Sequence, residues 1–119
     1  MKQQEVTLKL SDHIALDIAM SSDEGDKINV LIRTALEKAE KVILDFSDIN
    51  IMTTAFLNAA IGQLYKDFSS DILKRRLSVV NLKDSDITIF KLVTNRAKDY
   101  FGNNEQFSKT VNEVIHGKN

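Results

Sequence analysis

Adjacent hydroxyl side chains at Thr53 and Thr54 are the first candidates for chemistry in this sequence. They follow an apolar run that ends at Asp45 and a polar turn, and an apolar helical pattern begins just after them. A threonine oxygen in this position can satisfy a free N–H group at a helix start, which stabilises the helix by about 1 kcal/mol. A phosphate on the same hydroxyl would meet the positive end of the helix dipole. The pattern therefore predicts an N-cap and leaves both threonines as candidate phosphorylation sites.

The carboxylates of Asp45 and Asp48 lie in the same turn. Asp45 ends a strand-like run, as the phosphoacceptor of a receiver domain does, but a receiver also needs acidic residues after its first strand and a Lys-Pro pair after its last. This chain has no proline, and its first strand-like run ends in Leu10–Ser11. We therefore expect Asp45 to bond N–H groups of the loop and to fix the turn.

Histidines and cysteines give no support for catalysis or metal binding. The chain has no cysteine, and its two histidines, His13 and His116, have no partner at a metal-ligand spacing. The sequence also has no Gly-rich phosphate loop and no Ser/His/Asp set. We expect no metal, no cofactor and no enzymatic turnover.

The elements before the turn follow from hydrophobic periodicity. Residues 5–10 and 13–19 alternate between apolar and other side chains around Ser11–Asp12, which predicts an antiparallel hairpin. Residues 21–24 match a capping box, although Gly25 leaves the exact helix start open and Asp26 is an alternative cap; an amphipathic helix follows up to Ala39. Val42–Leu44 is an unbroken apolar run, which predicts a strand buried on both faces.

The elements after the turn alternate between helix and strand patterns. A second helix carries an apolar stripe from Leu57 to Phe68, and Gly62 within it, about 1 kcal/mol less favourable than Ala, indicates close helix packing. Asp71–Arg76 is expected to be a charged connection and Leu77–Leu82 a strand.

A third helix is predicted, with Asp84 or Ser85 as its cap. Tyr100–Phe101 fits a short edge strand or a helix end, and Asn103 with Gln106 predicts the cap of a last helix. The apolar residues of that last helix are Phe107, Val111, Val114 and Ile115.

The resulting order of elements is ββαβαβαα. Helices between buried strands imply parallel pairing with right-handed crossovers. We expect an α/β fold with a mixed sheet of about four to five strands covered by about four helices. The side chains expected to form its core are Leu31, Leu36, Ile43, Leu44, Leu57, Ile61, Leu64, Val79 and Phe90.

Composition bounds the class of protein. The chain has 119 residues, which predicts a single domain over residues 1–119, and 16 Lys and Arg against 17 Asp and Glu give a net charge of -1. Such a balance does not support a nucleic-acid or membrane partner. The first residues lack the apolar core of a signal peptide, and no apolar run is long enough to span a bilayer. We expect a cytoplasmic domain.

The stretch VILDFSDINIMTTAFLNAAIG, from Val42 to Gly62, resembles the STAS domains, the anti-sigma-factor antagonist family. More closely, it is similar to a bacterial STAS-like family of uncharacterised function. The matching features are the strand that ends in Leu44–Phe46, the turn that ends in Thr53–Thr54, and the following Phe56–Leu57. The order of elements agrees over nearly the whole chain.

In STAS antagonists this turn usually reads Asp-Ser-Ser/Thr-Gly, and a kinase phosphorylates the second hydroxyl residue to switch partners. By this resemblance Thr53 stands at the Asp, Thr54 at the first Ser, Ala55 at the phosphoacceptor and Phe56 at the Gly. The usual acceptor has lost its hydroxyl group, which leaves Thr54, one residue earlier, as a substitute. The resemblance implies binding of a protein partner, such as a GHKL-type ATP-binding kinase or an anti-sigma-like protein.

Met52 and Phe56 flank the polar turn outside the main apolar stripe. They fit either packing onto the neighbouring loop or an exposed apolar anchor for a partner. We therefore predict a non-enzymatic partner-switching module, and the alternative is a small-ligand sensor at the carboxyl ends of the strands. The predicted partner-binding residues are Asp48, Asn50, Met52, Thr53, Thr54, Phe56, Asn58 and Ala59.

Overall fold

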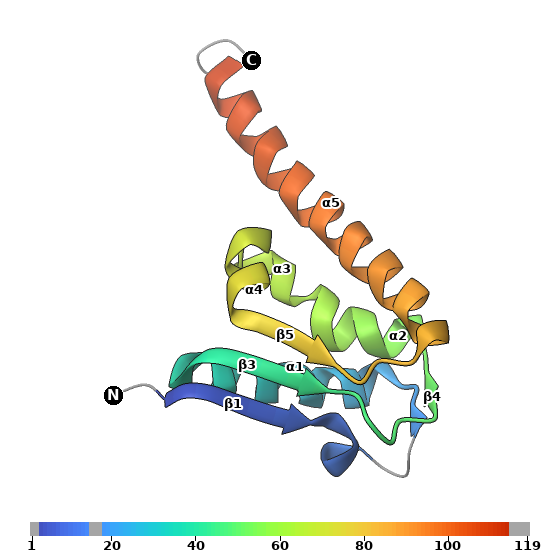
Figure 1. Ribbon diagram of the computed structural model, residues 1–119. Helices are drawn as coiled ribbons and strands as arrows, with labels where there is room; N and C mark the ends of the chain where they lie inside the picture. Colours follow the sequence, from blue (N-terminus) through green and yellow to red (C-terminus); the bar gives the residue numbers. More distant parts are fainter. Residues whose placement is uncertain (1–2, 15–17, 115–119) are drawn as a thin grey trace.

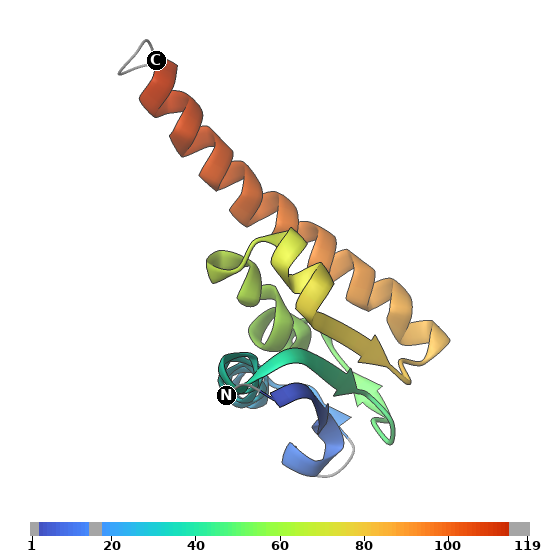
Figure 2. The same ribbon diagram turned by 60° about the vertical axis from the view of Figure 1, so that its left-hand side comes forward.

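The computed structural model describes residues 3–14 and 18–114, and the side chains of residues 4–14 and 18–102. Two small parallel sheets and a layer of helices make up the described chain (Figures 1 and 2). The strands are β1 (Gln3–Lys9), β2 (Ile18–Ala19), β3 (Ala39–Asp45), β4 (Ile51–Met52) and β5 (Leu77–Val80). The helices are the 3-10 turn η1 (Leu10–His13), α1 (Ser22–Lys38), α2 (Thr54–Leu57), the π-helical η2 (Asn58–Gly62), α3 (Leu64–Asp67), α4 (Ser70–Arg76) and α5 (Asp84–Val114).

The larger sheet has the order β1-β3-β5 and packs one face against the helices. On this face Val42 and Leu44 of the central strand are 0 % exposed, as their alternating positions require. Ile43 points the other way, in a row with Thr7 and Ser78, and is partly exposed. The parallel pairing is confirmed, but the prediction that this strand is buried on both faces is wrong, because the helices lie on a single face.

The predicted antiparallel hairpin is also wrong. Leu10–His13 forms η1, and β2 pairs in parallel with β4 instead of returning along β1. Alternation predicts a strand but not its partner, and Ser11–Asp12 lacks the Gly that two-residue hairpin turns favour. Leu10 and Ile14 are buried, so side chains on both sides of this turn pack in the core. The second half of the predicted hairpin includes Leu16, which lies outside the described residues.

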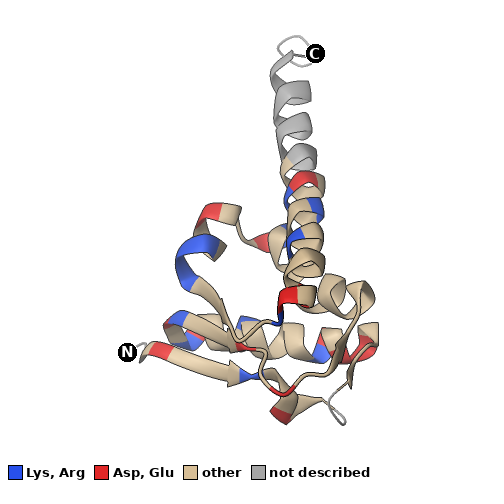
Figure 3. Cartoon of the chain, turned by 45° about the vertical axis from the view of Figure 1, so that its right-hand side comes forward, with Lys and Arg blue, Asp and Glu red and all other residues tan. Residues whose placement is uncertain are grey.

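Residues 71–76 form a helix, not the predicted connection. Ser69 caps α4 because its side-chain oxygen accepts a hydrogen bond from the Ile72 N–H at 3.2 Å. Leu73 is buried, and Arg76 donates to the carbonyl oxygens of Leu36, Ala39 and Glu40. The cap, the buried leucine and the bonds of this arginine together stabilise α4. Figure 3 shows this helix as strongly basic.

A single helix, α5, runs from Asp84 to Val114 and continues beyond the other helices (Figure 1). Tyr100–Phe101 is therefore neither a strand nor a helix end, and Asn103 does not cap a separate helix. A Cβ atom added at Gly102 would meet no atom within 4 Å, and with no proline nearby one partly exposed glycine does not break a helix. The side chains of Phe107, Val111 and Val114, and the whole of Ile115, lie outside the described part.

The helical layer and the sheet enclose one hydrophobic core, as the sequence predicts. Members of the predicted core that are buried in this cluster are Leu36, Leu44, Leu57, Ile61 and Leu64. Partly buried members that pack against it are Leu31, Val79 and Phe90. Ile43 is the exception, since it lies on the face of the sheet away from the helices.

The glycine that permits a close helix contact is Gly25 of α1, and not Gly62. A Cβ atom at Gly25 would lie 2.5 Å from the carbonyl oxygen of Phe56 and 2.7 Å from the Cβ atom of Ala59. A Cβ atom at Gly62 would be at least 3.5 Å from its nearest neighbours, which is ordinary van der Waals contact. The interpretation of Gly62 as a packing requirement is wrong, because its neighbours leave room for a methyl group.

The two glycines give a matched stability test. Gly25→Ala should lower the free energy of unfolding by about 1–3 kcal/mol, because the methyl group overlaps the backbone of α2. Gly62→Ala should raise it by up to about 1 kcal/mol, because alanine favours a helix and fits the space. Equilibrium urea unfolding of both variants measures this, and equal effects would contradict the assignment of the close contact to Gly25.

Adjacent residues of β3 test which face of the sheet is covered. Leu44→Ala should cost about 2–5 kcal/mol because it leaves a cavity in the core. Ile43→Ala should cost clearly less, since the side chain is already partly exposed. Urea unfolding curves of the two variants give both values, and a loss at Ile43 as large as that at Leu44 would show that the second face is also covered.

Candidate functional site

The turn after β3 is held to its neighbouring strands by polar side chains. The Asp45 Oδ1 atom accepts hydrogen bonds from the Asn81 side chain and the Ser47 N–H, both at 2.9 Å. The Asn81 bond and then the Ser47 bonds lower the pKa of Asp45 from its ordinary value. The prediction that Asp45 bonds a loop N–H group is therefore confirmed, and this carboxylate fixes the turn.

Two lysines fix the rest of the turn. Lys9 of β1 forms an ion pair with Asp48 at 2.8 Å, and Lys83 donates to the carbonyl oxygen of Asn50 at 2.6 Å. The hydrogen bond and the charge of Asp48 raise the pKa of Lys9. Asp48 also has a φ of 64°, a left-handed conformation that Asp tolerates better than most residues. The turn is thus tied to the chain on both sides of β3.

Thr53 is the N-cap of α2. Its Oγ1 atom accepts from the Phe56 N–H at 3.2 Å and donates to the carbonyl oxygen of Met20 at 2.6 Å. The predicted cap is confirmed at Thr53. Thr54 is exposed, and its hydroxyl group makes no hydrogen bond with the part of the chain that the structure describes. The two threonines therefore have different roles, one structural and one with an accessible oxygen.

Met52 and Phe56 are not accessible anchors. Met52 is 6 % exposed and Phe56 0 % exposed, and Ala59 is also buried. The pairing of β4 with β2 points Met52 inward together with Ala19, and the third position of α2 turns Phe56 toward the core. The interpretation of Met52 and Phe56 as an exposed anchor is wrong, and both side chains pack in the hydrophobic core.

The accessible apolar side chains beside the turn are Ile51 and Met20, which are 46 % and 50 % exposed. Ile51 pairs with Ile18 across the β2-β4 ribbon, and Met20 follows two residues after Ile18, so all three side chains point to the same side. Sequence reasoning missed this patch because it paired the strand at Ile18 with β1. The only signal was the spacing of Ile18 and Met20, two residues apart.

Exposed polar residues precede and follow Ile51 along the chain. Asp48, Asn50, Thr54 and Asn58 are exposed, and Thr54 and Asn58 are one helical turn apart on the same side. Here "turn surface" denotes Met20, Asp48, Asn50, Ile51, Thr54 and Asn58. It combines exposed apolar and exposed polar side chains, as protein–protein contact regions do.

A π-helical turn, η2, continues the helix that carries the turn surface. The Gln63 N–H donates to the Asn58 carbonyl oxygen at 3.1 Å, a bond between residues five positions apart. Within η2, the Ala59 carbonyl oxygen accepts from the Gln63 side chain at 2.9 Å, and the Ala60 carbonyl oxygen accepts from Asn29 of α1 at 3.0 Å. Side chains thus bond the carbonyl oxygens of the irregular turn.

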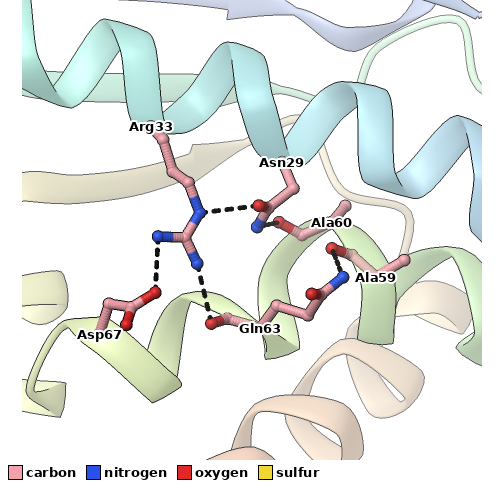
Figure 4. Close-up of polar contacts among 6 residues, drawn as sticks. All are labelled: Asn29, Arg33, Ala59, Ala60, Gln63 and Asp67. Atoms are coloured by element: carbon pink, nitrogen blue, oxygen red, sulfur yellow. Dashed lines mark hydrogen bonds and ion pairs between the residues drawn. The ribbon is translucent and has the colours of Figure 1, made fainter.

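Arg33 of α1 connects this turn to α3 (Figure 4). Its guanidinium group donates to the Asn29 Oδ1 atom at 2.8 Å and to the Gln63 carbonyl oxygen at 3.1 Å, and pairs with Asp67 at 2.7 Å. Asn29 is buried, so its satisfied amide adds specificity to the contact between the helices. The position of the turn surface therefore depends on α1.

Side chains for metal binding do not converge among the described side chains, those of residues 4–14 and 18–102. This part of the chain contains no group of three or more His, Cys, Asp or Glu residues that could hold a metal ion. His13 is exposed in η1, and His116 lies outside the described residues. None of the described helices combines the length and apolar character needed to cross a bilayer.

The model of one protein family, described as a STAS-like domain of unknown function (DUF4325), matches residues 24–86, which is more than half of the chain. The chain belongs to this family. The matched region runs from the first turn of α1 to the start of α5, so it includes the turn, the π-helical segment and β5. No curated protein and no solved structure matches the chain significantly. The STAS-like resemblance and the α/β class are confirmed.

The two threonines of this STAS-like domain should differ in their effect on stability. Thr53→Ala removes the cap of α2 and the bond to Met20, and should cost about 1–2 kcal/mol. Thr54→Ala should change stability by less than about 0.5 kcal/mol, because the exposed hydroxyl group bonds no described residue. Urea unfolding compares the two variants, and a larger loss at Thr54 would contradict the assigned cap.

Proposed function

We propose that this STAS-like domain is a non-enzymatic interaction module of bacterial partner switching. It docks the turn surface on another protein, such as a GHKL-type ATP-binding kinase or an anti-sigma-like protein. The observation that supports this most is the exposure of the apolar side chains Ile51 and Met20 together with that of Thr54, which follows three residues after Ile51. Family membership supports the fold of such a module, and the partner is inferred by analogy with STAS antagonists.

In this proposal Thr54, rather than Thr53, accepts the phosphate group. The Thr53 oxygen already makes two hydrogen bonds that hold α2 and β2 together, and a phosphate there would break both. A phosphate on Thr54 would add a charge of about -1.5 to -2 three residues after Ile51 and one helical turn before Asn58. A partner that buries Ile51 would then have to bury this charge, so phosphorylation releases the partner.

The alternative, a small-ligand sensor at the carboxyl ends of the strands, has less support. The charged and amide side chains at that edge bond each other, as Lys9 does with Asp48 and Asp45 with Asn81. They are therefore engaged in holding the turn and are less available to a ligand.

Site-specific photo-crosslinking tests the proposed surface. A photoreactive amino acid replaces Ile51 in cells of the source organism, and Val30, an apolar residue of α1 that is 61 % exposed, serves as the matched control. We expect a protein with a GHKL-type ATPase fold, or an anti-sigma-like protein, to be crosslinked at position 51 and not at position 30. Equal crosslinking at both positions would contradict a specific interface at the turn.

Binding of the identified partner, purified, then gives the energetic test. Ile51→Asp should weaken binding at least about tenfold, equivalent to about 1.4 kcal/mol, while Val30→Asp should leave the affinity unchanged. Melting temperatures of both variants show whether the domain stays folded. If the partner is a kinase, mass spectrometry after incubation with ATP should locate phosphate on Thr54 and none in Thr54→Ala. Unchanged affinity of Ile51→Asp would reject this surface.

A further inference from the structure

A cavity of about 270 Å³ lies between α4, β5 and α5, away from the turn surface. Its lining includes residues of α4 and Leu77, the first residue of β5, whereas the turn surface lies on the segment after β3, on β4 and at the start of the helix that follows β4 (Figures 1 and 2). The proposed partner-binding function uses none of the residues that line it.

The floor of the cavity is apolar. Ile61 and Leu73 are buried there, and Leu77, Val79 and Phe90 line it while they remain partly exposed. The two β5 residues lie in the same rows as Val42 and Leu44, which are 0 % exposed under the helices. On β5 the helices therefore leave apolar surface that a bound molecule could cover.

The border of the cavity is polar and carries a net positive charge. Lys74 of α4 and Lys98 of α5 contribute ammonium groups from two different helices, and Asp71 contributes one carboxylate. Neither lysine forms an ion pair or hydrogen bond with any residue that the structure describes. Figure 3 shows the basic residues of α4 and of the adjacent part of α5 in blue. Two cations against one anion leave one positive charge, which matches a ligand with a single negative charge.

A hydrogen-bond donor accompanies these lysines. Tyr65 of α3 lines the cavity, and its hydroxyl group bonds no described residue. Burial raises the pKa of Tyr65, so the phenol stays protonated and can donate. Thr94 and Asn95 of α5 add neutral polar groups to the same border.

We propose that this cavity binds a small organic carboxylate with an aromatic or branched apolar body. The carboxylate lies between Lys74 and Lys98, and the body lies on Phe90, Leu77 and Val79. A cavity of about 150 Å³ holds benzene, so this one has room for about ten non-hydrogen atoms. Carboxylate and ammonium groups pair well at such a half-open site, where the apolar floor strengthens their attraction.

Amide chemical shifts in NMR spectra of the full chain test the proposal with two probes, phenylacetate and 4-methylpentanoate. At least one probe should give saturable shifts centred on Leu73, Val79 and Thr94, with a dissociation constant of about 1–10 mM, as expected for so few atoms. Phenylacetamide, which has nearly the same shape without the charge, should bind at least about tenfold more weakly. Absence of saturable shifts for both probes up to about 20 mM would overturn the proposal.

Matched variants separate a specific site from general attraction of anions. The double variant Lys74→Gln/Lys98→Gln should weaken binding at least about tenfold, while Lys27→Gln/Lys41→Gln, with the same change in net charge at exposed positions outside the cavity, should not. Thr94→Phe should fill the cavity and abolish the shifts, and its own spectrum shows whether it is folded. Equal weakening by the two double variants, or retained binding in folded Thr94→Phe, would overturn the site. The turn surface is unchanged in all these variants, so their outcome is independent of the partner-binding proposal.

Discussion

The close contact between α1 and the helix that follows the turn is the constraint on which the rest of the structure depends. Gly25, Asn29 and Arg33 are spaced four residues apart, so they form one stripe along α1. The first admits the backbone of α2, the second bonds the π-helical turn, and the third reaches α3. These three contacts fix how closely the α2–η2–α3 helix approaches α1 and in which direction it runs. They therefore also fix the position of Thr53 and of the β2-β4 ribbon.

Features that depend on neighbouring residues could be predicted from the sequence. Ser21 caps α1 and Thr53 caps α2 because a short polar side chain precedes an apolar helical pattern in both places. Asp45 bonds a loop N–H group for a similar local reason. The helical pattern between Val42–Leu44 and the next strand correctly predicted that these two strands pair in parallel, because parallel neighbours need a connection of helix length.

Features that depend on distant partners could not be predicted in the same way. The alternation around Ile18 does correspond to a strand, but this strand pairs with β4, more than thirty residues later. The pairing determines which residue of β4 is exposed, and it is not the residue that the sequence predicts. Ile51, and not Met52, therefore faces outward. The contact of Gly25 with Phe56 is equally long-range, so the sequence does not indicate it. Periodicity instead places Gly62 in the middle of a helix, which led to the incorrect packing interpretation.

The π-helical turn has a consequence for how this domain tolerates change. Each residue of an α-helix rotates the following side chains by about 100°, so one additional residue at η2 offsets the two ends of the helix by that angle. On both sides of this offset the helix is packed in the core, with Phe56 and Leu57 of α2 and Leu64 of α3 all 0 % exposed. A sequence alignment that closes a one-residue gap in this segment would equate residues that face different neighbours. Insertions and deletions at 58–62 are thus changes of orientation as well as of length, and they offer a simple route by which related domains could present different side chains on the same fold.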